Sequence, residues 1–211
     1  KSGRELLRLI NDILDLSKVE AGKLDINVAP ISLAELADDI GRNFRRQAGS
    51  KRLKFDVTVD PALPATLQND RQRLDQILTN LISNAIKFTD EGGVDIAFSA
   101  RPDNSVAIAV RDTGIGISRD KQAAVFEAFV QAEGGTSRKY GGTGLGLSIS
   151  RELAKLLNGR IDLDSEPGRG STFTLVIPLA IESRQASSAA PPSRPVIHKV
   201  VVTGSDSPFV D

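Results

Sequence analysis

Three short stretches of this chain combine polar side chains with glycines in patterns suited to a phosphorylated ligand. The first is RKYGGTGLG, residues 138–146, whose glycines run directly into an apolar segment with helical spacing at residues 145–157. Backbone N–H groups at a helix start attract anions, phosphate above all. The spacing excludes a P-loop, because G-x-x-x-x-G-K-S/T does not occur, and a dinucleotide-binding turn, because Ile149 stands where Gly or Ala is required. The sequence therefore predicts a phosphate-binding loop of another class.

The second stretch lies on a predicted helix at residues 70–88, with Asp70 as its N-cap. Asn80 and Asn84 are one helical turn apart and project from one side, and Lys87 follows on the neighbouring strip. Asparagine is a poor helix former, so two of them in an otherwise amphipathic helix lower its propensity without an evident packing gain. The alternative is a hydrogen-bonded surface pair, which an isolated Asn pair usually is.

The third stretch is DTGIGI, residues 112–117, at the end of a predicted strand over residues 106–112. A carboxylate at a strand end, followed by glycines that let a planar ligand approach the backbone, is suited to recognising a nucleobase. The alternative is that Asp112 only caps its own turn through its side chain, as Asp-Thr-Gly segments often do.

The elements that must position these stretches can be read from hydrophobic periodicity. A further helix is predicted at residues 5–23, and another begins at Ser32 with a capping box completed by Glu35. Other strands are predicted at residues 53–59, 94–100, 160–165 and 172–179. Residues 131–142 are polar and glycine-rich and are interpreted as a lid. Phe126 and Phe129 are expected to be core residues that support this lid.

Composition narrows the class of protein. With 211 residues, 40% hydrophobic and 26% charged, the chain is predicted to be globular. Lys and Arg together number 27, as do Asp and Glu, so no global charge favours nucleic acid or an anionic membrane. Cysteine is absent, which removes disulfides and thiolate metal sites. No apolar run reaches the roughly 18 residues of a membrane span, and the N-terminus lacks a signal-peptide pattern, so we expect a cytoplasmic domain.

Four motifs together resemble those of sensor histidine kinases. The asparagine box, first glycine box, phenylalanine box and second glycine box of that family are similar to residues 80–89 (NLISNAIKFT), 112–117 (DTGIGI), 126–129 (FEAF) and 141–147 (GGTGLGL). The motifs stand in the family's order, and the resemblance covers residues 5–179. It implies the α+β fold shared with type II topoisomerases, mismatch-repair ATPases and heat-shock chaperones. This is a two-layer α/β sandwich in which helices back a mixed, mostly antiparallel sheet.

The resemblance implies ATP and magnesium as ligands. The family pattern assigns Asn84 to the magnesium ion that bridges the phosphates, Lys87 to the phosphates, and Arg138 to the charge on the transferred group. For Lys87 and Arg138 the alternative is an ordinary solvated charge. Asn80 occupies the position where the chaperone and topoisomerase ATPases carry a glutamate that activates water. Because an amide cannot act as a general base, this position favours transfer to a protein side chain over rapid hydrolysis.

The same resemblance places the rest of the nucleotide site. Asp112 would accept a hydrogen bond from the adenine amino group. The amides of Gly144, Leu145 and Gly146 would take the phosphates at the helix start. The other residues expected around the nucleotide are Gly114, Gly116, Ile117, Phe129, Tyr140, Gly142 and Thr143.

The phosphoacceptor of the family is missing. Histidine kinases phosphorylate a histidine in a two-helix dimerisation domain, within a motif resembling S-H-E-L-R-T-P that this sequence lacks. The only histidine, His198, has no adjacent acidic residue and is interpreted as incidental. We expect four segments: residues 1–25, the end of the second dimerisation helix; 26–181, the catalytic domain; 182–196, a linker; and 197–211, the truncated start of a receiver-like domain. Residues 199–202 resemble a first receiver strand without its acidic pair.

The sequence thus predicts the ATP-binding catalytic domain of a two-component sensor histidine kinase of the hybrid kind. Its expected partners are ATP, a dimerisation domain that carries the phosphoacceptor histidine, and a downstream receiver-like domain or response regulator, with no nucleic acid. We expect the longer protein to be a homodimer and any inner-membrane anchor to lie outside this sequence. One alternative is a degenerate kinase that senses nucleotide or binds a protein partner. Another, an ATPase clamp of the chaperone or mismatch-repair type, is disfavoured by Asn80.

Overall fold

The computed structural model describes residues 14, 17, 24–129 and 144–180. The helix predicted at residues 5–23, the lid at 131–142, and the segments 182–196 and 197–211 fall outside these residues, apart from positions 14 and 17. No helix in the described part of the chain combines the length and apolarity needed to cross a bilayer.

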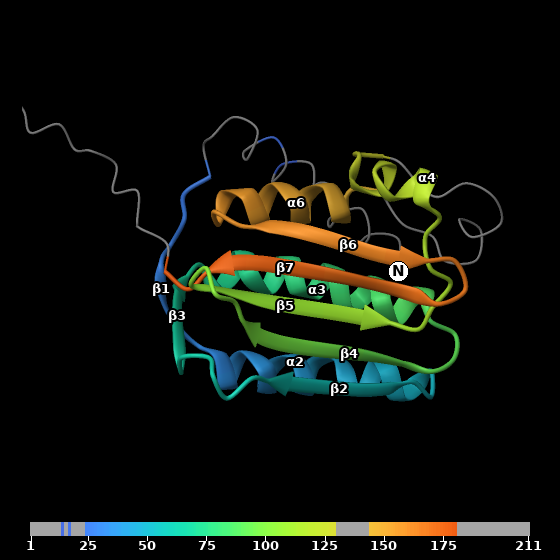
Figure 1. The fold of residues 1–211 in the computed structure, drawn as a ribbon, viewed down its shortest axis with the longest axis horizontal. Coiled ribbons are helices and arrows are strands. Elements are labelled where there is room, and N and C mark those ends of the chain that lie inside the picture. Colours follow the sequence, from blue (N-terminus) through green and yellow to red (C-terminus); the bar gives the residue numbers. More distant parts are fainter. Residues whose placement is uncertain (1–13, 15–16, 18–23, 130–143, 181–211) are drawn as a thin grey trace, which may run out of the picture.

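A five-stranded sheet with the order β2-β4-β5-β7-β6 is the frame of the molecule (Figure 1). Its strands are β2 (Lys54–Val59), β4 (Gly93–Ala100), β5 (Ser105–Asp112), β6 (Arg160–Glu166) and β7 (Gly170–Pro178). The β2–β4 pair is parallel and the other three pairs are antiparallel. Helices α2 (Leu33–Ser50), α3 (Arg71–Phe88) and α6 (Gly146–Leu156) lie against one face (Figure 1). The predicted two-layer α+β fold with a mixed, mostly antiparallel sheet is confirmed.

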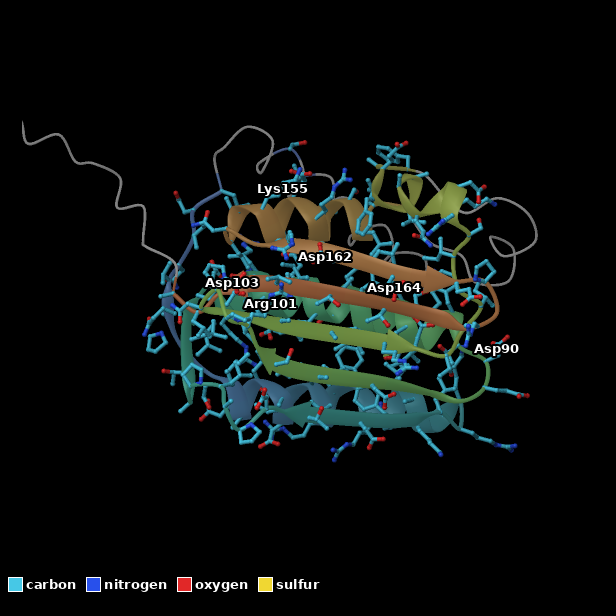
Figure 2. All side chains as sticks on the ribbon, in the orientation of Figure 1. Asp90, Arg101, Asp103, Lys155, Asp162 and Asp164 are labelled. Carbon is cyan, nitrogen blue, oxygen red and sulfur yellow. The ribbon has the colours of Figure 1, made fainter. Side chains whose placement is uncertain are left out.

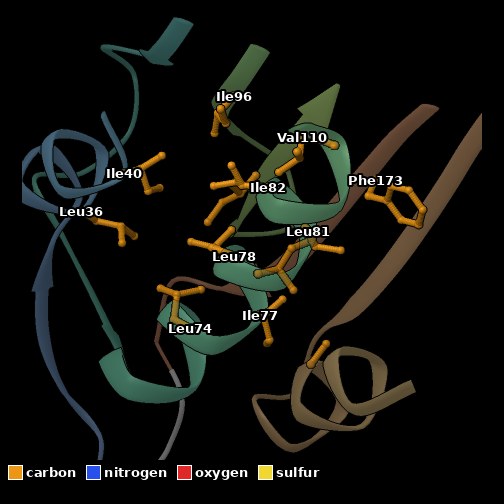
Figure 3. Close-up of a cluster of buried hydrophobic side chains, with 14 of the residues drawn as sticks. Leu36, Ile40, Leu74, Ile77, Leu78, Leu81, Ile82, Ile96, Val110 and Phe173 are labelled. Carbon is orange, nitrogen blue, oxygen red and sulfur yellow. The ribbon is translucent and has the colours of Figure 1, made fainter. Parts of the chain in front are cut away.

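The core forms where the inward side of the sheet meets α3. One row of facing residues crosses the whole sheet, and it consists of Val57, Ile96, Val110, Phe173 and Leu163. The buried side of α3 packs on this sheet (Figure 3), and its residues are Leu74, Ile77, Leu78, Leu81, Ile82, Ala85 and Ile86. These are the residues that helical periodicity predicts. On the opposite sheet face, Asp162 and Asp164 of β6 are exposed (Figure 2).

The start of α3 is held by Asp70, as predicted. Its Oδ1 accepts from the Arg73 N–H at 3.1 Å, and its Oδ2 accepts from the Asn27 N–H at 2.9 Å. The carboxylate therefore joins the helix start to the chain preceding β1 (Ala29–Ser32). This strand pairs with β3 (Thr66–Asn69) in a separate two-stranded sheet that the sequence pattern does not predict. The N-cap predicted at Ser32 is confirmed, since its hydroxyl accepts from the Glu35 N–H at 3.3 Å.

Replacing Asp70 by alanine is expected to lower the free energy of unfolding by about 2 kcal/mol, because the side chain is buried and two backbone N–H groups lose their acceptor. Urea denaturation followed by circular dichroism measures this change. Asp70→Asn is the matched variant: its amide oxygen still caps α3, so we expect about half the loss. An equal loss in both variants would contradict the cap as its source.

Candidate functional site

The three stretches singled out in the sequence lie on adjoining elements of the fold. Asn80, Asn84 and Lys87 lie on α3, Asp112 ends β5, and Gly146 begins α6. Helices α3 and α6 pack side by side, and the loop after β5 meets the C-terminal end of α3. The described parts of the stretches therefore surround the C-terminal half of one helix.

Asn80 contacts the first residue of α6. A Cβ atom on Gly146 would lie 2.3 Å from Asn80 Oδ1, so a side chain there would collide with the amide. Asn80 Nδ2 donates to Ser150 Oγ at 2.9 Å, and Asn84 Nδ2 approaches Asn80 Oδ1 at 3.5 Å. The structure thus brings together Asn80, Asn84 and Gly146. Sequence reasoning missed Ser150, whose signal is its position one helical turn after Gly146.

The start of α6 is anchored by an apolar residue. Leu145 occupies the N-cap position with a fully buried side chain that makes no capping hydrogen bond. Gly144 precedes it with φ +71°, a conformation that favours glycine. The first N–H groups of a helix have no intrahelical acceptors, so this end of α6 presents positive potential beside the Asn80 amide.

Asp112 is buried at the end of β5 and is oriented through one oxygen. Its Oδ1 accepts from the Gly114 N–H at 2.8 Å and from the Ser171 N–H at 3.3 Å. No described residue donates to Oδ2, which leaves that oxygen able to accept from a ligand. Burial raises the pKa of the Asp112 carboxyl, while the two backbone hydrogen bonds act in the opposite direction. Asp112 does cap its own turn, as the alternative interpretation expects, but it uses only Oδ1 to do so.

Close packing of the backbone requires glycine at positions 114 and 116. A Cβ on Gly114 would lie 2.4 Å from the carbonyl oxygen of Phe88, and one on Gly116 would lie 2.0 Å from that of Glu166. Protein backbone occupies both Cβ directions, so these glycines let the loop fit between the end of α3 and the end of β6. The expectation that they also let a planar ligand approach the backbone stays a prediction.

The end of β6 and the start of β7 contribute contacts that sequence reasoning missed. The Ser165 hydroxyl accepts from the Ile117 N–H at 2.8 Å and donates to the Gly170 carbonyl at 3.0 Å. Gly170 has φ +98°, and a Cβ there would lie 2.0 Å from the Asp112 carbonyl oxygen. The Ser171 N–H and the close approach of Gly170 therefore hold Asp112 in place. The signal in the sequence is the repeated glycine of Gly-Arg-Gly.

Other predicted residues have mixed outcomes. Phe126 is buried in edge-to-face contact with Phe173, with ring centroids 6.2 Å apart, as expected of a core residue. The same expectation is wrong for Phe129, which is 65% exposed at φ +65°, although its N–H donates to the Gly144 carbonyl at 3.1 Å. Its backbone therefore joins the two ends of the predicted lid.

Lys87 is half-buried with its Nζ atom 4.7 Å from the centroid of the Phe88 ring. The remaining predicted site residues lie outside the described part of the chain, and they are Arg138, Tyr140, Gly142 and Thr143.

Comparison with known proteins identifies the family. Residues 69–181 match the family described as Histidine kinase-, DNA gyrase B-, and HSP90-like ATPase. Because this match covers more than half of the chain, the chain belongs to that family.

Its relatives by sequence include hybrid kinases. Hybrid signal transduction histidine kinase L of Dictyostelium discoideum is 43% identical over 181 residues, which are 83% of this chain and 11% of that protein. Sensor protein GacS of Pseudomonas syringae pv. syringae is 44% identical over 198 residues, which are 90% of this chain and 22% of that protein. This chain therefore spans less than a quarter of the length of these curated relatives.

Solved structures agree with the sequence relatives. Full-length ShkA in complex with AMPPNP matches with a TM-score of 0.77 and 35% identity, over 86% of this chain and 37% of that chain. The nucleotide-free catalytic domain of histidine kinase ThkA matches with a TM-score of 0.63 and 25% identity, over 73% of this chain and 97% of that chain. The fold is thus that of histidine kinase catalytic domains.

Proposed function

We propose that this chain is the ATP-binding catalytic domain of a two-component sensor histidine kinase, which transfers the γ-phosphoryl of Mg-ATP to a histidine of a dimerisation domain. The observation that carries the proposal is the Asp112 carboxylate, which is buried, oriented through Oδ1 and left with Oδ2 able to accept. A buried carboxylate with an uncommitted oxygen requires a donor, and the exocyclic amino group of adenine is one. Guanine carries a carbonyl oxygen at that place and would be rejected.

We place the phosphates where α6 begins, beside Asn80 of α3. There the amides of Gly144, Leu145 and Gly146 would bind phosphate oxygens at the positive end of the helix, with Lys87 adding charge. Arg138 would neutralise the transferred group. The residues proposed to border the nucleotide elsewhere are Gly114, Gly116, Ile117, Phe129, Tyr140, Gly142 and Thr143.

A magnesium ion fits the donor set of α3. The Asn84 amide donates through Nδ2 toward Asn80, and no described residue donates to its Oδ1. An uncommitted amide oxygen is a ligand that Mg²⁺ accepts, and the ion usually takes few protein ligands beside substrate phosphates. When bound, magnesium supplies charge neutralisation at the phosphates.

Asn80 supports transfer rather than hydrolysis. Its amide is held by Ser150 and lies against Gly146, beside the proposed phosphate end of the site. An amide cannot take a proton from water at neutral pH, so this position provides no general base. Asn80 is therefore proposed to hold the start of α6 in place while a histidine attacks the γ-phosphoryl group.

The accepting histidine is proposed to come from a dimerisation domain in a longer, homodimeric hybrid kinase, whose receiver-like domain or response regulator takes the phosphoryl group next. We propose a catalytic domain at 26–181, a linker at 182–196 and a receiver-like start at 197–211. The end of the family match at residue 181 supports the C-terminal boundary of the catalytic domain alone. Residues 1–25 are proposed to continue the dimerisation helix. We place the domain in the cytoplasm, where ATP is available, with any membrane anchor in another part of the protein.

Calorimetric titration with AMPPNP and a phosphotransfer assay test this function together. The chain is expected to bind the nucleotide more tightly with magnesium, and to phosphorylate a separately supplied dimerisation domain of a hybrid kinase relative. Asn84→Ala is expected to lose about tenfold in affinity with magnesium and less than twofold without it, because only the metal-dependent contact is removed.

Asn43→Ala is the matched control, since Asn43 is exposed on α2 and its removal should change neither affinity. Nucleotide binding without any transfer would favour the degenerate, nucleotide-sensing alternative. Failure of the unmutated chain to bind AMPPNP would contradict the proposed function as a whole.

A further inference from the structure

Lys51 reaches from α2 to the C-terminal end of α3. Its Nζ atom donates to the carbonyl oxygens of Ile86 at 2.9 Å, Lys87 at 3.0 Å and Thr89 at 2.9 Å. The last carbonyls of a helix lack intrahelical donors and form the negative end of its dipole, so an ammonium group with three donors suits them. The contact joins residues more than thirty positions apart in the sequence.

The side chain of Lys51 does not cap α2, the helix that it follows. The end of α2 is closed by backbone, because the Lys51 N–H donates to the Ala48 carbonyl at 3.0 Å. Lys87, the basic residue in the last turn of α3, directs its Nζ atom over the Phe88 ring. Lys51 therefore donates hydrogen bonds to three backbone carbonyls at the end of α3.

Those carbonyls lie next to the loop of residues 112–116, which we propose recognises the base. The Phe88 carbonyl, between two that Lys51 holds, accepts from the Ile115 N–H at 3.3 Å. A Cβ on Gly114 would lie 2.4 Å from the same oxygen, so the loop is in direct contact with it. The Gly114 N–H in turn donates to Asp112 Oδ1. A continuous set of contacts therefore runs from Lys51, through the end of α3, to the buried carboxylate.

We propose that Lys51 is a positioning residue for adenine recognition: it fixes the end of α3, against which the Asp112–Gly116 loop is set, without touching the nucleotide. The inference rests on the proposed nucleotide site. The position of Asp112 depends on a lysine of a different helix, whereas the phosphate end of the site, at Asn80 and Gly146, is held by its own contact with α6. Loss of Lys51 should therefore affect base recognition selectively.

The experiment compares Lys51→Met with the unmutated chain at a temperature well below the melting point of both. ADP affinity is expected to fall about tenfold while the affinity for tripolyphosphate, which has no base, changes less than twofold. Hydrogen exchange at the Ile115 amide, measured by NMR without nucleotide, is expected to rise about tenfold. A general loss of stability would not separate the two ligands in this way.

Two further variants sharpen the comparison. Lys51→Arg, which keeps donors for the carbonyls, should retain ADP affinity within about threefold. Lys54→Met removes an exposed lysine three residues away and should leave ADP affinity and Ile115 exchange unchanged. Should Lys51→Met not fold, Lys51→Gln keeps two donors on a shorter side chain and should lose about threefold in ADP affinity alone.

Equal losses for ADP and tripolyphosphate, or unchanged exchange at Ile115, would overturn the positioning role. If the unmutated chain binds neither ligand, the proposed nucleotide site fails, and the exchange of Ile115 still decides whether Lys51 orders the loop. The two failures are therefore distinguishable.

Discussion

Asp112→Asn is expected to weaken ADP binding by about 100-fold while leaving the fold intact. The replacement keeps an oxygen that can accept from the Gly114 and Ser171 N–H groups, so the loop geometry is retained. It places an amide donor where the carboxylate Oδ2 would accept from the adenine amino group, so two donors face each other in a buried site. Isothermal titration at pH 7 measures the change.

The pH dependence of binding should follow the same carboxylate. Because burial raises the pKa of Asp112, its acceptor form is lost on acidification at a higher pH than the usual aspartate value of about 3.9. ADP affinity should therefore begin to fall at a correspondingly higher pH. Asp112→Asn should lack this step, and since the phosphates titrate equally in both proteins, the difference between the two profiles isolates Asp112.

The stability of the nucleotide-free chain should also depend on the pKa of Asp112. A carboxyl whose pKa is higher folded than unfolded contributes most stability below the unfolded pKa, and the contribution is lost as the pH rises through the folded pKa. Asp112→Asn removes that loss, so the variant should melt at the same temperature as the unmutated chain or higher at pH 7.

Asp95→Asn, at an exposed position of β4, should change neither the melting temperature nor the ADP affinity. Equal ADP affinity of the two variants would exclude Asp112 from base recognition.

Helix α3 could be predicted from sequence because its information is local. Apolar residues recur at helical spacing, Asp70 provides a cap, and the polar residues Asn80 and Asn84 interrupt the pattern on one side. The four-residue strands β1 and β3 could not be predicted, because each is too short to show an alternating hydrophobic pattern and β1 contains a proline. They are defined by pairing with each other across more than thirty residues, and such pairing leaves no local signal.

The residues of the candidate site also differ in whether their signal in the sequence is local. Asp112 is conspicuous because a carboxylate precedes two glycines, but its partner Ser171 depends on the register of β5 against β7, which no short pattern encodes. Lys51 likewise reads as one more surface charge until α2 and α3 are placed together. Helical spacing from Phe126 does not predict the exposure of Phe129, because the chain leaves helical geometry there with φ +65°. The chemical groups of the site can thus be predicted from short patterns, whereas the residues that hold them in place depend on tertiary contacts.

Gly116→Ala is expected to lower the free energy of unfolding by about 3 kcal/mol or more and to weaken ADP binding at least tenfold. Two effects combine at this position. Gly116 has φ +66°, where an L-residue is strained by about 1 kcal/mol, and its new Cβ would lie 2.0 Å from the Glu166 carbonyl oxygen. That atom is backbone in the β6–β7 turn, so it cannot rotate away, and the loop that carries Asp112 must move.

Gly168→Ala separates the effect of backbone strain at positive φ from the effect of a steric clash at Cβ. Gly168 lies in the adjoining turn at φ +78°, donates its N–H to the Ile115 carbonyl at 2.8 Å, and has no atom within 4 Å of an added Cβ. This variant therefore carries the backbone strain alone and should lose about 1 kcal/mol with ADP affinity nearly unchanged. Urea denaturation and titration calorimetry on both variants measure the difference. If the two lost equal stability and affinity, close backbone packing at Gly116 would not be what holds Asp112 in place, and the Ser171 N–H would remain as its main support.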